Sequence, residues 1–483
     1  MTILISAFFW WNLWNNRNAQ AIPNPDIFQY IGDGYRYINF KLPDSIHPPP
    51  LAPIMITSLA KILSSFVIYP EIAAVKLINI TLSSLTLVAI YILVSPIISP
   101  LFSFLLVLLV ATNQINLLYS VDVTNEIIYS FFLTLSLILY YYRKKPYVYL
   151  LFGLLFLLRY ESVVIPISVF IIEHYSKRPS LKLKNILFSF IPIFLWLIVL
   201  NFHSRIGNSI LGNAYIEEIF NGLKKLPNLL NYYSLIDLIT FESSYPLQNQ
   251  NQFFSFVVLC LSTYGIINQK SKPIQKIIYL AFFLHQLFLF AFPNFAIRYN
   301  TPMIWILYLI LSNHKSKYIS FAVLVCLLGY NIARIDVPSS YSHPNDMKEY
   351  RLVADWLNKT KFQKPTTVLI YEPHILRYYV IKKEVYVPYD SETPFQKCKE
   401  DIICICESLL NKNHTDTNIY VITSAYSTND YSFSHDKFTP ILHHIGIFND
   451  KIYQKNPDFT FVTQIMSDDG NNWANVWQYI PAK

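Results

Sequence analysis

Long apolar runs separated by short polar loops fill residues 1–335. A helix needs about 20 apolar residues to cross a hydrocarbon core of about 30 Å, and these runs approach that length. The pattern therefore predicts eleven membrane-spanning helices, at residues 1–15, 74–95, 97–113, 126–142, 146–160, 161–176, 185–203, 252–268, 277–293, 299–313 and 318–335.

Charged residues sort to opposite ends of these runs. The short loops at 143–145, 177–184, 270–276 and 315–317 hold basic residues and no acidic ones. Because Lys and Arg in short loops stay cytoplasmic, the acidic loops are predicted to face the outside. We therefore expect a multi-pass protein of the inner (plasma) membrane with an outward-facing polar site.

Residues 51–68 form a further apolar run inside the first outer loop, 16–73. A charge at the bilayer centre costs about 2.5–3.5 kcal/mol on insertion scales, and Lys61 lies in the middle of this run. The run also has an apolar helical face. We interpret it as an interfacial amphipathic helix, the alternative being a twelfth span.

Residues 336–483 differ in composition from the rest of the chain. They are polar, with strand-like runs at 366–371, 418–423, 461–465 and 476–480 and helical patterns at 346–359 and 395–411. This alternation predicts a small C-terminal α/β domain. Counting the predicted spans from the cytoplasmic basic loops places this domain on the outer side of the membrane. The predicted division is therefore 1–335 for the membrane domain and 336–483 for the extracytoplasmic domain.

Composition excludes several classes of protein. The chain has 483 residues, 53% of them hydrophobic and 14% charged, against about 25% charged in typical soluble domains. Its net charge of +8 comes from the cytoplasmic loops, so nucleic-acid binding is not expected. Of five cysteines, Cys398, Cys404 and Cys406 lie in the tail, where one disulfide is feasible if the tail is outside.

The first candidate for chemistry is Asp33 in the first outer loop, followed by His47 and the run PPPL. A proline run fixes the approach to a helix start. A carboxylate held near the membrane surface can act as a general base for an acceptor hydroxyl. The alternative is a solvated loop acid.

Two further groups lie at the outer ends of predicted spans. Asp122 and Glu126 are four residues apart, although acids are favoured at a helix N-terminus without any function. Arg159 and Glu161 lie between two spans, where a local ion pair or a snorkelling arginine is the simpler explanation.

Arg298 and Tyr299 precede a late span, where an arginine can bind a phosphate with two hydrogen bonds. No nucleotide-binding or zinc-protease motif occurs in the sequence. Since only short loops are predicted to face the cytoplasm, a transferred group must come from a donor that reaches the outer face, most simply a lipid-linked one.

In this order and on one side of the membrane, the segments resemble the polytopic GT-C type glycosyltransferases of families 39 and 83. These use polyprenyl-phosphate sugars and include protein O-mannosyltransferases and the lipid A aminoarabinose transferase. The resemblance covers residues 1–335 and rests on an outer-loop acid, a (H/K)PPL box, an acid at the fourth span, a G-L-x-x-x-x-R stretch and an Arg-Tyr pair before a proline. These are Asp33, His47–Leu51, Glu126, Gly153–Arg159, and Arg298-Tyr299 with Pro302.

The resemblance implies an inverting, metal-independent transfer of a sugar to a hydroxyl on an acceptor lipid, glycan or protein, with no cofactor. Asp33 would deprotonate or orient the acceptor, and Arg298, helped by Arg159, would hold the phosphate of the donor. Glu126 would shape the site or assist Asp33, with Asp122, His47, Tyr299 and Glu161 in supporting places. Gly34 follows Asp33 where the family often has a second acid, which leaves Asp26 and Asp44 as rival bases.

Two other classes of function stay open. A transporter or lipid-linked-glycan flippase usually has glycine-broken spans with mid-span charges. Here only 10 glycines occur and the acids lie at span ends, although His285 lies inside a span. A non-catalytic scaffold that binds a partner through its tail is the third possibility.

Overall fold

The structure is a computed structural model of the chain. It describes residues 2–15, 26–41, 49–67, 69–113, 116–117, 125–143, 145–175, 183–207, 263–264, 266–267, 272–290, 301–312, 316–333, 348–371, 373–388, 398, 401–413, 417–425, 427, 448–467, 470 and 473–480.

The chain divides into two compact units. The first comprises Met1–Gln20 and Tyr30–Tyr341, and the second comprises Ala21–Gln29 and Ser342–Lys483. Within the second unit, the ring of Phe28 lies 5.0 Å from that of Tyr378. The predicted boundary at 335/336 did not anticipate that an N-terminal segment would group with the tail.

The first unit is helical, and the first four residues of its helix α2 (Asp26–Ile38) belong to the second unit. Its elements are α1 (Thr2–Asn15), α2 (Asp26–Ile38), α3 (Leu51–Leu63), α4 (Pro70–Val94), α5 (Pro100–Thr112), α7 (Asn125–Arg143), α8 (Pro146–Leu154), η1 (Leu155–Leu157), η2 (Tyr160–Val163), α9 (Val164–Tyr175), α10 (Leu183–Gly207), α14 (Pro273–Phe290), α15 (Ile304–Ser312) and α16 (Lys317–Ala333).

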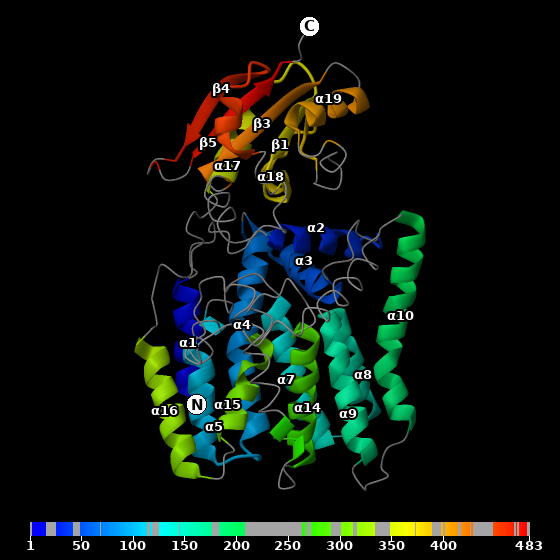
Figure 1. Cartoon of the computed structure of the whole chain (residues 1–483), viewed down its shortest axis with the longest axis vertical. Coiled ribbons are helices and arrows are strands. Elements are labelled where there is room, and N and C mark those ends of the chain that lie inside the picture. Colours follow the sequence, from blue (N-terminus) through cyan, green and yellow to red (C-terminus); the bar gives the residue numbers. More distant parts are fainter. Residues whose placement is uncertain are drawn as a thin grey trace. The chain divides into compact units, whose positions relative to one another are not determined.

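Most of these helices run side by side, whereas α2 lies across their common direction (Figure 1). Among the described residues, Pro70–Val94 is the helix that is long and apolar enough to cross a membrane, with 25 residues and a mean hydropathy of 2.2. Shorter apolar helices occur at Pro100–Thr112, Pro146–Leu157 and Lys317–Ala333, among others. The count of eleven spans stays a prediction.

The predicted helix over 51–68 is present as α3, which ends at Leu63 after 13 residues. At 1.5 Å per residue this is about 20 Å, short of the roughly 30 Å hydrocarbon core. Lys61 lies in its last turn. Since the predicted span α5 also has 13 residues, the interfacial interpretation of α3 stays a prediction.

The outer faces of two helices are apolar. Both α10 and α16 expose large hydrophobic side chains instead of burying them, among them Phe194, Leu195, Tyr318, Ile319 and Phe321. Soluble monomers rarely expose contiguous apolar patches of more than a few hundred Å². This pattern is typical of contact with lipid.

The second unit is a five-stranded sheet with helices. Its elements are α17 (Lys348–Lys359), β1 (Thr366–Ile370), α18 (Pro373–Tyr379), β2 (Val385–Tyr386), α19 (Ile402–Asn413), β3 (Asn418–Ser424), α21 (Asp450–Tyr453), β4 (Phe459–Met466) and β5 (Trp473–Tyr479).

The strand order is β2-β1-β3-β5-β4. β1 pairs in parallel with β2 and β3, with Val368 opposite Tyr420, whereas β5 is antiparallel to β3 and β4. β1 is buried along its whole length, as expected for a strand covered on both faces. The four predicted strands and both predicted helices are present, although α19 begins at Ile402 and not at residue 395, and the unpredicted β2 has only two residues.

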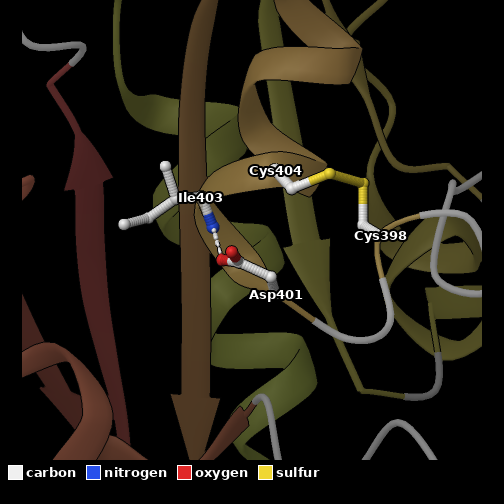
Figure 2. Close-up of a disulfide and its surroundings, with 4 residues drawn as sticks. All are labelled: Cys398, Asp401, Ile403 and Cys404. Atoms are coloured by element: carbon white, nitrogen blue, oxygen red, sulfur yellow. Dashed lines mark hydrogen bonds between the residues drawn. A yellow bond between two sulfur atoms is a disulfide. The ribbon is translucent and has the colours of Figure 1, made fainter.

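One disulfide joins Cys398 and Cys404 beside the start of α19, and Cys406 is a buried free thiol. In the same turn the carboxylate of Asp401 accepts a hydrogen bond from the backbone N–H of Ile403 at 2.9 Å (Figure 2). Burial and the nearby carboxylates of Glu407 and Asp401 raise the pKa of the Cys406 thiol.

Candidate active site

A break between two apolar helices carries the charged residues of the site. The chain passes from α8 through η1 to Arg159, whose backbone is extended (φ −152°, ψ 130°), and then through η2 into α9. Because α8 and η1 together have 12 residues, they rise only about 18 Å. The turn between α8 and α9 is therefore expected to lie below the outer edge of a hydrocarbon core of about 30 Å.

Arg159 lies between two carboxylates in this turn. Its Nη1 is 2.8 Å from Oε1 of Glu126 in the first turn of α7, and its Nε donates to Oε1 of Glu161. The three residues are 6%, 2% and 8% exposed. We call Glu126, Arg159 and Glu161 the ion cluster. Buried charges of this kind are stable only when paired.

The neighbouring contacts fix the ion cluster in place. The side-chain amide of Asn125 donates to the carbonyl of Leu158 at 2.7 Å, which ties the start of α7 to the turn. The ring of Tyr129 lies 6.0 Å from Cζ of Arg159, within range of a cation–π contact. The predicted local pair of Arg159 and Glu161 is present, but Glu126 joins it.

Asp33 lies on α2 and is 8% exposed. The sequence interpretation placed it in an outer loop, and the loop contains a helix at this point. The helix forms because its apolar residues, including Ile27 and Ile31, recur on one face and are buried. Gly34 brings α2 against α3, since a Cβ at this position would lie 2.4 Å from the carbonyl oxygen of Pro53.

Two tyrosines connect α2 to the rest of the unit. The hydroxyl of Tyr35 donates to Oε1 of Glu71 at the start of α4, at 2.6 Å. Burial raises the pKa of Tyr37, and the nearby Asp33 and Tyr160 raise it further. Tyr37 lies one helical turn after Asp33 and packs, with Tyr160 of the turn, against the same buried cluster, so it joins Asp33 to the turn that holds the ion cluster.

An aromatic group lies beside this link. The ring of Tyr37 is 6.1 Å from that of Trp196 on α10, and Nε1 of Trp196 donates to the hydroxyl of Tyr160 at 3.3 Å. Phe156 and Ile193 pack in the same cluster. The aromatic group therefore holds α2, the α8–α9 turn and α10 together.

The structure thus brings Asp33 and the ion cluster into one region, although they come from three separate parts of the sequence. Asp122, His47, Arg298 and Tyr299 lie outside the described residues. So do the rival base Asp44 and the side chain of Asp26. No group of three or more potential metal-binding side chains occurs among the described residues.

Sequence reasoning missed Tyr37, Tyr129 and Trp196. Tyr37 is four residues after Asp33, a spacing that places both on one helix face, but this signal could be used only once residues 26–38 were known to be helical. Gly153, part of the resemblance, has a packing role, because a Cβ there would lie 2.1 Å from the carbonyl oxygen of Ser189. His285, which lies inside a predicted span, is completely buried in α14.

Comparison with known proteins gives a structural likeness. No protein-family model and no curated protein sequence matches the chain. Solved structures with similar folds include the oligosaccharyltransferase of Archaeoglobus fulgidus in complex with Zn and sulfate. It has a TM-score of 0.53 and 13% identity, over 97% of this chain and 72% of that chain.

Two further structures extend the likeness. The archaeal oligosaccharyltransferase AglB from Archaeoglobus fulgidus, in complex with an inhibitory peptide and a dolichol-phosphate, has a TM-score of 0.50 and 12% identity, over 98% of this chain and 73% of that chain. ArnT from Cupriavidus metallidurans, bound to undecaprenyl phosphate, has a TM-score of 0.50 and 9% identity, over 98% and 97% of the two chains. The chain therefore has the fold of the GT-C glycosyltransferases.

Proposed function

We propose that this protein is an integral membrane glycosyltransferase. It transfers a sugar from a polyprenyl-phosphate donor to a hydroxyl group of an acceptor. The observation that carries the proposal is the buried Asp33 on α2, joined to the region of the ion cluster by the packing of Tyr37, in a chain with the GT-C fold. Two proteins with this fold were solved with dolichol-phosphate or undecaprenyl phosphate bound.

The proposed reaction is an inverting displacement. The acceptor oxygen attacks the anomeric carbon as its proton passes to the carboxylate of Asp33. The bond from the anomeric carbon to the phosphate oxygen breaks, and polyprenyl phosphate leaves with its electron pair. Proton transfer to a positioned base contributes typically 10²–10⁴-fold to a rate.

The ion pairs of the ion cluster count against its acids as the base. Glu126 and Glu161 each direct a carboxylate oxygen to Arg159, so both are engaged in buried ion pairs. The same arrangement makes Arg159 a poor phosphate ligand, because two carboxylates already surround it. We therefore propose that Arg298 holds the phosphate and that Arg159 holds the ion cluster together.

We also propose that the site and the sheet unit face the outside of the cell. The distribution of basic loops supports this orientation. The disulfide between Cys398 and Cys404 supports it independently, because disulfides persist in oxidising compartments.

The test is release of polyprenyl phosphate from a panel of radiolabelled polyprenyl-phosphate sugars by purified wild type and Asp33→Asn. We expect release by the wild type and a loss of at least about 100-fold in the variant. Asp355→Asn, a change at an exposed position on α17, is the matched control and is expected to release as the wild type does.

Each other outcome has a defined meaning. Release by both proteins would keep the class of enzyme and move the base to Glu126 or Asp122. Release by neither, with any donor, would contradict the proposal and favour a transporter or scaffold.

A further inference from the structure

Two buried hydroxyl groups beside the ion cluster have no hydrogen-bond partner among the described residues. The side chains of Tyr129 and Ser162 are completely buried, and neither hydroxyl has a hydrogen-bond partner among the residues that the structure describes. A buried polar group without a partner costs stability and needs an explanation.

Nearby hydroxyl groups are satisfied. On α7, Thr134 donates to the carbonyl of Ser130 at 2.8 Å, and on α9, Ser168 donates to that of Val164 at 2.7 Å. Tyr140, also on α7, donates to Glu173. The same fold therefore satisfies hydroxyls of the same kinds at these positions. Besides Tyr129 and Ser162, the buried hydroxyls of Tyr37 and Thr301 also lack a partner among the described residues, but they do not belong to residues of α7 or η2.

Tyr129 and Ser162 share a neighbour, the ion cluster. Tyr129 follows Glu126 by one helical turn, and its ring lies 6.0 Å from Cζ of Arg159. Ser162 directly follows Glu161 in η2. The two residues come from different elements, and each adjoins the ion cluster, Tyr129 through its ring and Ser162 through its place in the chain.

Charge decides which ligand fits these hydroxyls. The ion cluster has two carboxylates and one guanidinium, a formal charge of −1. This charge repels a phosphate, whereas a neutral ligand with many hydroxyls meets no repulsion and supplies both donors and acceptors. We propose that Tyr129 and Ser162 bind the sugar of the donor and determine which sugar is accepted. This inference rests on the proposed function.

The experiment compares kcat/KM and KM for the best polyprenyl-phosphate sugar of the panel and for its monodeoxy analogues. We expect the wild type to disfavour at least one analogue by about 10-fold or more, because a group built to bind a hydroxyl is left unpaired when the hydroxyl is missing. Tyr129→Phe or Ser162→Ala should lose about 10-fold or more in kcat/KM for the full sugar and no longer disfavour that analogue.

Thermal unfolding without donor separates this role from a structural one. Removing a hydroxyl that has no partner should leave the unfolding temperature unchanged or raise it. The matched controls are Tyr140→Phe and Ser168→Ala, which remove hydroxyls with partners. They should keep the wild-type discrimination between sugars and should not raise the unfolding temperature.

Several results would overturn the inference. If both site variants discriminate between sugars as the wild type does, the inference fails and the proposed function stands. A lowered unfolding temperature with unchanged KM for the donor also contradicts it, since that is the mark of a structural hydroxyl. If the wild type releases polyprenyl phosphate from no donor, the proposed function fails and the inference fails with it.

Discussion

Gly34 determines how closely α2 approaches α3. A Cβ at this position would lie 2.4 Å from the carbonyl oxygen of Pro53 and 2.5 Å from Cγ2 of Thr57. The backbone oxygen cannot rotate away as a flexible side chain would. Gly34 therefore has a packing role, and it sets the position of the neighbouring Asp33.

Replacing Gly34 by alanine should push α2 away from α3. We expect Gly34→Ala to destabilise the protein by about 1–3 kcal/mol, as overpacking does, and to reduce transfer because Asp33 moves. Thermal unfolding in detergent and release of polyprenyl phosphate measure the two effects.

The control is Gly329→Ala on α16, where a Cβ would meet nothing within 4 Å. Alanine is favoured over glycine inside a helix by about 0.5–1 kcal/mol, so this variant should be as stable as the wild type or more so. Equal stability of the two variants would refute the close packing of α2 on α3.

At the scale of elements, the break between α8 and α9 creates the ion cluster. A continuous helix would carry Arg159 and Glu161 on different faces, since residues two apart do not face each other. The extended backbone at Arg159 instead lets its guanidinium reach Glu161 and also Glu126 on α7. The break in the helix is therefore what assembles three charged groups in a buried place.

The disulfide beside α19 is the second local constraint. Cys398 and Cys404 are six residues apart. A disulfide across so short a loop lowers the entropy of the unfolded chain, which stabilises the folded protein by about 2 kcal/mol. We expect the double variant Cys398→Ser with Cys404→Ser to lose about that much stability. Denaturant unfolding of the full chain, with and without reductant, measures it.

Reductant should destabilise the wild type and leave the double variant unaffected.

Cys406 should resist alkylation in the native protein, because burial raises the pKa of its thiol and the thiolate is the reactive form. Alkylation of Cys406 in the native protein at neutral pH would contradict its buried position.

At the scale of the whole molecule, the helical unit has an apolar exterior where a soluble protein would have a polar one. Side chains such as Leu195 and Leu197 on α10 and Val325 on α16 point outward and are exposed. Interior polar groups are buried instead, including Asn79 and Ser83 on α4. This reversal follows if lipid covers the helices, since apolar side chains then lose nothing by facing outward.

Membrane insertion and sidedness can be measured together. In a bacterial expression host, the protein should remain in the membrane pellet after an alkaline carbonate wash. Protease added to intact spheroplasts should cleave within residues 342–483, which form the sheet unit with Ala21–Gln29. Cleavage only after lysis would place that unit on the cytoplasmic side and refute the proposed orientation.

The sequence by itself determined the local structure. Apolar runs with polar ends indicated the helices, and alternating strands and helices in the tail indicated the sheet unit. The short separation of Arg159 and Glu161 suggested a local ion pair. These features depend on neighbouring residues, whose pattern is visible along the chain.

Only the tertiary structure decided which distant residues meet. The ion pair of Glu126 with Arg159, the contact of Tyr37 with Trp196 and the hydroxyls of Tyr129 and Ser162 at the ion cluster all join elements that are far apart in sequence. The hydropathy of a residue predicts whether it is buried, but not which residues it contacts. That choice follows from close packing, at points such as Gly34 and Gly153 where the absence of a side chain lets two helices touch.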